Sequence, residues 1–208
     1  MIATFSSNPN GLSCGAGARI AALILLVFSL SGCGINNIPT YEENARAKWS
    51  EVLNQYQRRA DLIPNLVETV KGFAAQEKDV LTSVVEARAK ATATQLPSDI
   101  LTDPDAFKAF QENQSALSGA LSRLLVTVER YPDLKSNQNF LALQSQLEGT
   151  ENRIAVARRD YIEAVRLYNT ELKTIPGRWW RSIMYSDSIP MQTFTVDAET
   201  QQNPKVKF

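Results

Sequence analysis

Histidine is absent from this 208-residue chain, and cysteine occurs only twice, as Cys14 and Cys33. A chain without histidine lacks the commonest general base at neutral pH and the commonest metal ligand in proteins. Both cysteines precede the first amphipathic pattern, so neither a disulfide framework nor a zinc site is expected. The sequence therefore predicts no catalytic residue, no metal and no cofactor.

The chain also lacks net charge, because its 22 basic and 22 acidic side chains cancel. A protein without a broad positive field does not gather phosphates along a nucleic acid, so DNA and RNA are not expected as partners. Apolar residues make up 44% of the sequence and charged residues 21%, which is typical of globular proteins. One domain with one core is expected.

The amino-terminal segment has the pattern of a bacterial signal peptide. Residues 20–30 are uncharged and largely apolar, and Arg19 precedes them. This run is shorter than the roughly 20 apolar residues that cross a bilayer as a helix. The residues at its end resemble a bacterial lipobox: Leu30, Ser31, Gly32 and Cys33.

Use of this lipobox would make Cys33 the first mature residue and attach a diacylglycerol to its thiol. Two or more acyl chains anchor a protein stably to a membrane. The residue after the cysteine is Gly34 and not an aspartate. In bacterial lipoproteins this favours the outer membrane, if the source has one. The alternative keeps the leader as a permanent transmembrane helix. Either anchor predicts a membrane-bound protein of the bacterial envelope with its body outside the cytoplasm.

A helical pattern begins after the leader. Thr40 stands three residues before Glu43, a spacing typical of a capping box, so a helix is predicted to start near Tyr41. Pro64 would remove one backbone hydrogen bond, which predicts a kink or a break. Because the apolar spacing of three and four continues in register beyond Pro64, we predict one kinked helix that ends before a loop at residues 95–105.

Two more long helices are predicted after that loop. Asp103 and Pro104 provide an amino-terminal cap and a first-turn proline for a helix that stops at residues 131–132. Another helix is predicted over residues 136–174, with possible fraying at Gly149, since glycine costs about 1 kcal/mol relative to alanine.

These patterns predict an all-α fold, an antiparallel bundle of three long helices plus a short C-terminal helix around residues 179–184. Each helix has one apolar seam and needs partners to bury it; such seams also permit coiled-coil self-association. The chain is divided into a signal peptide or anchor at 1–32, a linker at 33–40, a helical bundle at 41–185 and a C-terminal tail at 186–208.

Two ordered blocks of residues stand out in the body. The first is RRADLIPNLVETVKGF at residues 58–73; the second begins with YPDLK at residues 131–135 and continues between residues 150 and 169. Both blocks resemble the LemA family of bacterial proteins. The resemblance implies a helical bundle on the extracytoplasmic side of a membrane, tethered at its amino end. Ile162 and the ending at residues 178–190 depart from the family pattern, so the carboxy-terminal contact surface is expected to differ.

Several polar side chains on the long helices are candidates for a cluster between them. Such a cluster would be either a ligand site or a structural network, and charged groups on helices usually stay exposed or paired. A carboxylate pair such as Glu68 with Glu151 could serve acid and base roles in a hydrolase, but nothing in the sequence brings the two together. The candidates are Asn65, Glu68, Arg88, Glu151, Asn152, Arg153 and Arg158.

A second candidate is the run Arg178, Trp179, Trp180 and Arg181. Tryptophan and arginine both favour wet interfaces with one apolar side, so this run could contact lipid head groups or a protein partner. In the alternative interpretation, the tryptophans close the open end of the bundle and the arginines flank them.

The features together predict a non-enzymatic, membrane-anchored envelope protein. Its helical surface would serve as a scaffold or interaction module for other envelope proteins, or for a second copy of the chain. The alternative function is that of an enzyme acting on an envelope substrate through carboxylates and arginines between the helices.

Overall fold

The computed structural model describes residue 17, residues 34–93, residue 97 and residues 99–195. Its regular structure within these residues is helical, so the predicted all-α bundle is confirmed. Apart from residue 17, the predicted signal peptide lies outside the described residues, as do the lipobox and Cys33. None of the helices in the described part of the chain combines the length and the apolar character needed to cross a bilayer.

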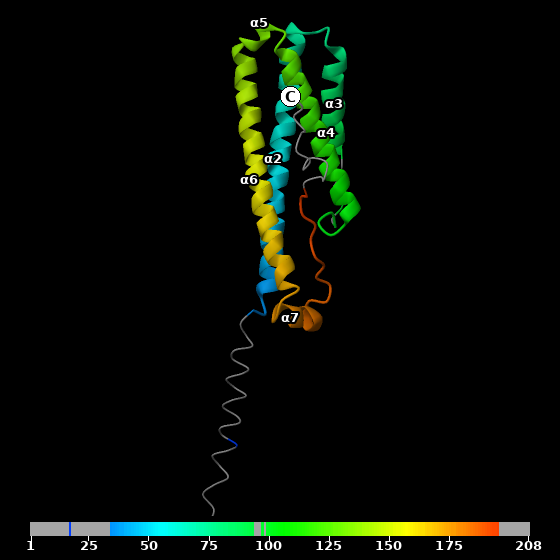
Figure 1. The fold of residues 1–208 in the computed structure, drawn as a ribbon, viewed down its shortest axis with the longest axis vertical. Coiled ribbons are helices and arrows are strands. Elements are labelled where there is room, and N and C mark those ends of the chain that lie inside the picture. Colours follow the sequence, from blue (N-terminus) through cyan, green and yellow to red (C-terminus); the bar gives the residue numbers. More distant parts are fainter. Residues whose placement is uncertain (1–16, 18–33, 94–96, 98, 196–208) are drawn as a thin grey trace, which may run out of the picture.

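Figure 1 shows an elongated bundle in which four helices run alternately up and down: α2 (Asn37–Phe73), α3 (Lys78–Ala93), α4 (Pro104–Val128) and α6 (Gln138–Glu171). The longest interface joins α2 to α6, and α3 pairs with α4. Short α5 (Pro132–Lys135) connects α4 to α6 at what we call the far end. Short α7 (Gly177–Met184) lies at the opposite end, the entry end, beside the start of α2.

The first predicted helix is two helices. Pro64 lies inside α2 and does not end it, whereas the chain reverses at residues 74–77, between α2 and α3. The single helix that we predicted up to residue 95 is therefore wrong. The reversal carries no glycine or proline; it is held by tertiary contacts, because Ala74 is fully buried and Glu77 accepts hydrogen bonds from Tyr131 and Arg130.

The helix cap predicted in the middle of the chain is confirmed, whereas the one predicted at the start of the first helix is not. Asp103 caps α4 as predicted, since its Oδ1 accepts from the backbone N–H groups of the first turn at 2.9 and 3.1 Å. The predicted capping box at Thr40 is wrong, because α2 already begins at Asn37. Complete burial of Ile38 and a hydrogen bond from Asn37 to Glu171 of α6 support this extra turn.

Part of the predicted tail belongs to the packed body. In the C-terminal segment, residues 185–195, Met191 and Phe194 are buried in the core. Asn169 of α6 holds this segment, since its side chain donates to the Met191 carbonyl and accepts from the Met191 N–H, both at 2.9 Å. The bundle therefore extends past the boundary predicted at residue 185, because side chains far away in the sequence satisfy the backbone of this segment.

The core has two parts along the axis of the bundle. The half at the entry end is the aromatic cluster, whose buried rings are Trp49, Tyr56, Phe107, Phe110, Tyr161, Tyr168 and Phe194. The half at the far end is the aliphatic cluster, whose largest buried side chains are Ile63, Leu66, Leu81, Leu117, Leu121, Leu124, Leu134, Phe140 and Leu147.

Candidate functional site

A layer of polar side chains separates the two clusters. On α2, Arg59 lies between Tyr56 of the aromatic cluster and Ile63 of the aliphatic cluster. On α4 and α6, polar residues also lie at the level between the two clusters. We call this set the polar layer, and it consists of Arg59, Gln114, Ser118 and Glu151.

The guanidinium of Arg59 is the centre of the polar layer and is only 1% exposed. Its Nη1 donates to Ser118 Oγ and to Glu151 Oε1, both at 2.8 Å, and its Nη2 donates to Gln114 Oε1 at 2.7 Å. One side chain of α2 thereby connects α4 and α6. Charge-assisted bonds of this kind are roughly twice as strong as neutral ones, and they fix the axial register of the three helices.

Two neighbours complete the surroundings of the polar layer. The Arg59 guanidinium lies 5.1 Å from the centroid of the Tyr56 ring, and the Arg158 guanidinium lies 4.3 Å from that of Phe194. Burial raises the pKa of the Tyr56 hydroxyl, and the two guanidinium groups oppose this shift. The polar layer thus lies beside a phenol that stays protonated near neutral pH, and its arginine acts as a hydrogen-bond donor.

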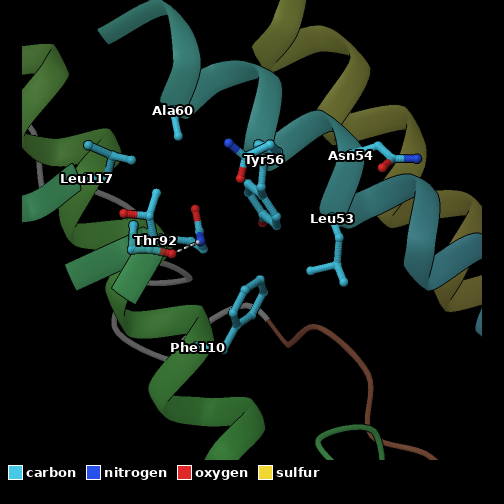
Figure 2. Close-up of a pocket in the computed structure, with 10 residues that line it drawn as sticks. Leu53, Asn54, Tyr56, Ala60, Thr92, Phe110 and Leu117 are labelled. Atoms are coloured by element: carbon cyan, nitrogen blue, oxygen red, sulfur yellow. Dashed lines mark hydrogen bonds between the residues drawn. The ribbon is translucent and has the colours of Figure 1, made fainter. Parts of the chain in front are cut away.

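Cavities lie on both sides of Tyr56 and Gln114. Figure 2 shows the larger, of about 260 Å³, where Tyr56 of α2 and Phe110 of α4 face each other and Thr92 of α3 contributes to the wall. The two rings meet edge to face at 5.5 Å. The smaller hollow, of about 80 Å³, is lined mainly by the polar layer and Arg158. It has room for water-sized molecules rather than for an organic substrate.

The structure brings some of the predicted polar candidates together and leaves others apart. Glu151 and Arg158 lie at the polar layer, and Arg88 of α3 donates from Nε to the Ala60 carbonyl at 2.8 Å. The remaining four are exposed on the helix surfaces: Asn65, Glu68, Asn152 and Arg153.

The centre of the polar layer, Arg59, was missed at the sequence level, as were Gln114 and Ser118. A signal for Arg59 was present, because it stands three residues after Tyr56 and four before Ile63, on the apolar seam of α2. A charge on such a seam indicates a buried, paired group. Its partners are 55 to 92 residues away in the chain, so their identity could not be read from local spacing.

The carboxylates considered as an acid and base pair have separate partners. Glu151 binds Arg59 at 2.8 Å, whereas Glu68 lies on the surface beside Lys71 at 3.7 Å. Within the described ranges, acidic and cysteine side chains do not gather in groups of three that could hold a metal ion.

The run of arginines and tryptophans lies on α7, and the structure divides it. Trp180 packs against the aromatic cluster, whereas Trp179 is 59% exposed. Gly177 is required where α7 begins, since a Cβ there would lie 2.2 Å from the backbone oxygen of Glu171. This close approach lets α7 turn across the end of the bundle and expose one of the two indoles.

The fold and these sites define a class: up-and-down helical bundles with a divided core and one end covered by a short amphipathic helix. The LemA family model matches residues 48–208, and the chain belongs to the LemA family. The resemblance seen in the sequence is thus confirmed.

Curated relatives carry a more specific description. Magnetosome protein MamQ 2 and Magnetosome protein MamQ 1 of Paramagnetospirillum magneticum are each 29% identical to this chain over 160 residues, which cover 69% of this chain and 59% of theirs. Magnetosome protein MamQ of Magnetospirillum gryphiswaldense is 27% identical over 157 residues, covering 68% and 58%. The matched part of the chain thus spans less than two thirds of the length of these relatives.

Proposed function

We propose that this chain is a non-enzymatic, membrane-anchored protein of the bacterial envelope, whose bundle is a scaffold or interaction module for other envelope proteins. Membership in the LemA family and the similarity to magnetosome proteins support a role at a membrane. The polar groups between the helices support a structural use, because Arg59 and Glu151 are paired with each other within the polar layer.

One observation carries the proposal: the chain enters the bundle at its end. Gly34 precedes α2, and a Cβ on Gly34 would lie 3.4 Å from Cγ of Pro176, just before α7. An anchor at Cys33 would therefore hold the entry end at the membrane. The 37 residues of α2 would then extend about 55 Å away from it, with the sides of the long helices free to meet partners.

A groove between α4 and α6 supplies a surface for such partners. It has a volume of about 470 Å³, and its apolar floor includes Leu121, Leu125 and Leu147. Ser122 and Gln144 line it as well. An apolar floor with polar margins suits the apolar side of a partner helix.

The first test concerns the anchor. Cells that express the full chain are grown with a labelled fatty acid, and their membranes are separated from soluble proteins. We expect label on the wild-type chain and on Cys14→Ser, and loss of both label and membrane retention in Cys33→Ser, since acyl chains supply the anchoring. Unlabelled Cys33→Ser that stays in the membrane would instead support a retained transmembrane leader.

The second test concerns the partners. A photo-crosslinking amino acid is placed in the full chain at Ser122, which lines the groove, and at Arg123, which is exposed on the adjacent face of α4. In living cells we expect adducts with other envelope proteins from position 122 and few from position 123. Equal adducts from both positions, or none from either, would contradict the proposed use of this groove.

A further inference from the structure

The outward side of α7 is the most strongly amphipathic surface at the entry end. Trp179 and Ile183, one turn apart, are 59% and 73% exposed, and Met184 is 55% exposed. Ile175, directly before the helix, is 65% exposed. Singly exposed apolar side chains are ordinary, but four within ten residues form a patch that calls for a partner.

Basic side chains outnumber acidic ones around this patch. Lys173, Arg178 and Arg181 lie within residues 172–186, and the acidic residues Glu171 and Asp187 border this stretch on either side. The chain as a whole has equal numbers of basic and acidic side chains, so the local excess is a property of α7 and its approach. A patch of this composition is complementary to an anionic surface with an apolar interior.

The position of α7 is fixed relative to the point where the chain enters. Trp180 packs against the aromatic cluster, and Gly177 lets the helix lie close to the end of α6. Gly34 faces Pro176 at the start of α7, with Asn37 of α2 hydrogen-bonded to Glu171 of α6 at 3.2 Å alongside. A membrane that anchors the chain just before Gly34 would therefore also lie next to the exposed side of α7.

We propose that α7 is an interfacial helix that binds the surface of an anionic lipid bilayer. Trp179 and Ile183 enter the boundary between head groups and acyl chains, and the exposed Arg178 binds lipid phosphates, while the partly buried Arg181 adds positive charge behind it. The inference rests on the proposed function, because the anchor delivers α7 to the bilayer. A protein partner is less well matched, since tryptophan flanked by arginine beside the proposed anchor is suited to the lipid–water interface.

The test uses the full, lipid-anchored chain in vesicles of phosphatidylglycerol and phosphatidylethanolamine. A photo-crosslinking amino acid replaces Ile183 in one sample and Val126 in another; Val126 is 72% exposed, near the far end of α4. Vesicle flotation is measured first, and lipid adducts are then counted by mass spectrometry. We expect lipid adducts at position 183 and only background at position 126.

The arginines are tested in the same vesicles. Together, Arg178→Gln and Arg181→Gln should lower the lipid adducts at position 183 by about tenfold or more, since each basic residue near an anionic surface contributes about fivefold. Vesicles of phosphatidylcholine alone should give a similar loss. The matched control, Arg123→Gln with Arg159→Gln, removes the same charge elsewhere and should leave the adducts unchanged.

The outcomes separate the two proposals. A chain that fails to float contradicts the proposed membrane anchoring. A chain that floats but gives no more lipid adduct at position 183 than at position 126 overturns the interfacial role of α7 alone. Adducts between two chains at position 183, in vesicles that hold no other protein, would show that a second copy covers α7 and would also overturn it. Circular dichroism of each variant verifies that the bundle is intact.

Discussion

The two halves of the core are built differently although the same helices run through both. The aromatic cluster contains seven buried rings, and Trp49 alone contacts four of them. The aliphatic cluster contains one buried ring, Phe140, and is otherwise made of leucine, isoleucine, valine and alanine. The difference follows from what each half must enclose.

The far end encloses mainly helices, and aliphatic side chains fill the narrow space between them. The entry end also encloses the C-terminal segment and the loop before α4, which bring backbone groups with no helical partner. The Tyr161 hydroxyl and neighbouring backbone groups satisfy them: Tyr161 donates to the Gln192 carbonyl at 2.8 Å, and the Gln192 N–H donates to the Leu101 carbonyl at 2.7 Å. Large side chains with a polar tip therefore accompany irregular backbone.

The polar layer marks the boundary between these two kinds of packing. Arg59 connects three helices at one level, so sliding α4 or α6 along α2 would leave a buried guanidinium without partners. The aliphatic seams by themselves would tolerate such sliding more readily, because apolar contacts are not directional.

The largest expected effect comes from breaking the aromatic cluster. Trp49→Ala should lower the free energy of unfolding by about 4 kcal/mol, and Leu124→Ala in the aliphatic cluster by about 3 kcal/mol, as measured by urea denaturation. The two should differ more clearly in location. Because Trp49 contacts Phe194, hydrogen exchange of the C-terminal segment should rise in Trp49→Ala and stay unchanged in Leu124→Ala. Equal exchange in both variants would mean that the halves are not distinct.

The next effect comes from the boundary itself. Glu151→Ala leaves Arg59, which is 1% exposed, without its counter-charge. We expect the free energy of unfolding to fall by about 3 kcal/mol. This is at the low end for buried ion pairs, because the Glu151 side chain is itself 46% exposed. Glu148→Ala, one turn away and exposed, should stay within about 0.5 kcal/mol of wild type. Chemical denaturation of both variants checks this. A similar small change in the two would show that the polar layer adds little to stability.

The smallest effect distinguishes the halves by their response to alkali. Burial raises the pKa of Tyr161, and it does the same for Tyr56 and Tyr168, all in the aromatic cluster. Unfolded tyrosines ionise near pH 10 while these stay protonated in the fold, so the stability they contribute is complete below about pH 10 and falls above it.

Tyr161, whose pKa is raised strongly, should contribute a decline of about 1.4 kcal/mol per pH unit above that point. Tyr161→Phe should make this decline shallower by that amount. Tyr131→Phe, near the far end, should change it far less: the hydrogen bond to Glu77 raises the pKa of Tyr131 as well, but the side chain is partly exposed and solvent weakens this interaction. Denaturation midpoints from pH 8 to 12 provide the measurement. If the free energy of unfolding falls with pH as steeply in Tyr161→Phe as in the wild type, Tyr161 is not the source of the decline.

Several features were predictable because they depend on neighbours in the chain. The seams of α4 and α6, the Asp103 cap and the helix limits near Pro132 and Pro176 all follow from local spacing or local hydrogen bonds. The two blocks that resemble the LemA family were likewise recognisable from the order of their residues. The Arg and Trp pairs on α7 were recognised, but which indole faces outward was not.

Other features depended on distant contacts. The reversal at residues 74–77 carries no turn signal of its own, and distant contacts accompany it: Ala74 is buried, and Glu77 accepts a hydrogen bond from Tyr131. The C-terminal segment has a loop composition, yet Met191 and Phe194 are buried and Asn169 and Tyr161 bind its backbone. The partners of Arg59 come from two other helices. Its place on the seam could indicate that Arg59 is buried, but the sequence could not show which residues pair with it.

By itself, the sequence determined that this protein is a bundle of amphipathic helices, since helical periodicity and capping act over three or four residues and need no knowledge of the fold. Only the tertiary structure decided where the first long seam turns back, which charge becomes the centre of the core, and which side of α7 is left to face outward. Those outcomes depend on groups that are separated by tens of residues, and only packing brings such groups to within hydrogen-bonding distance.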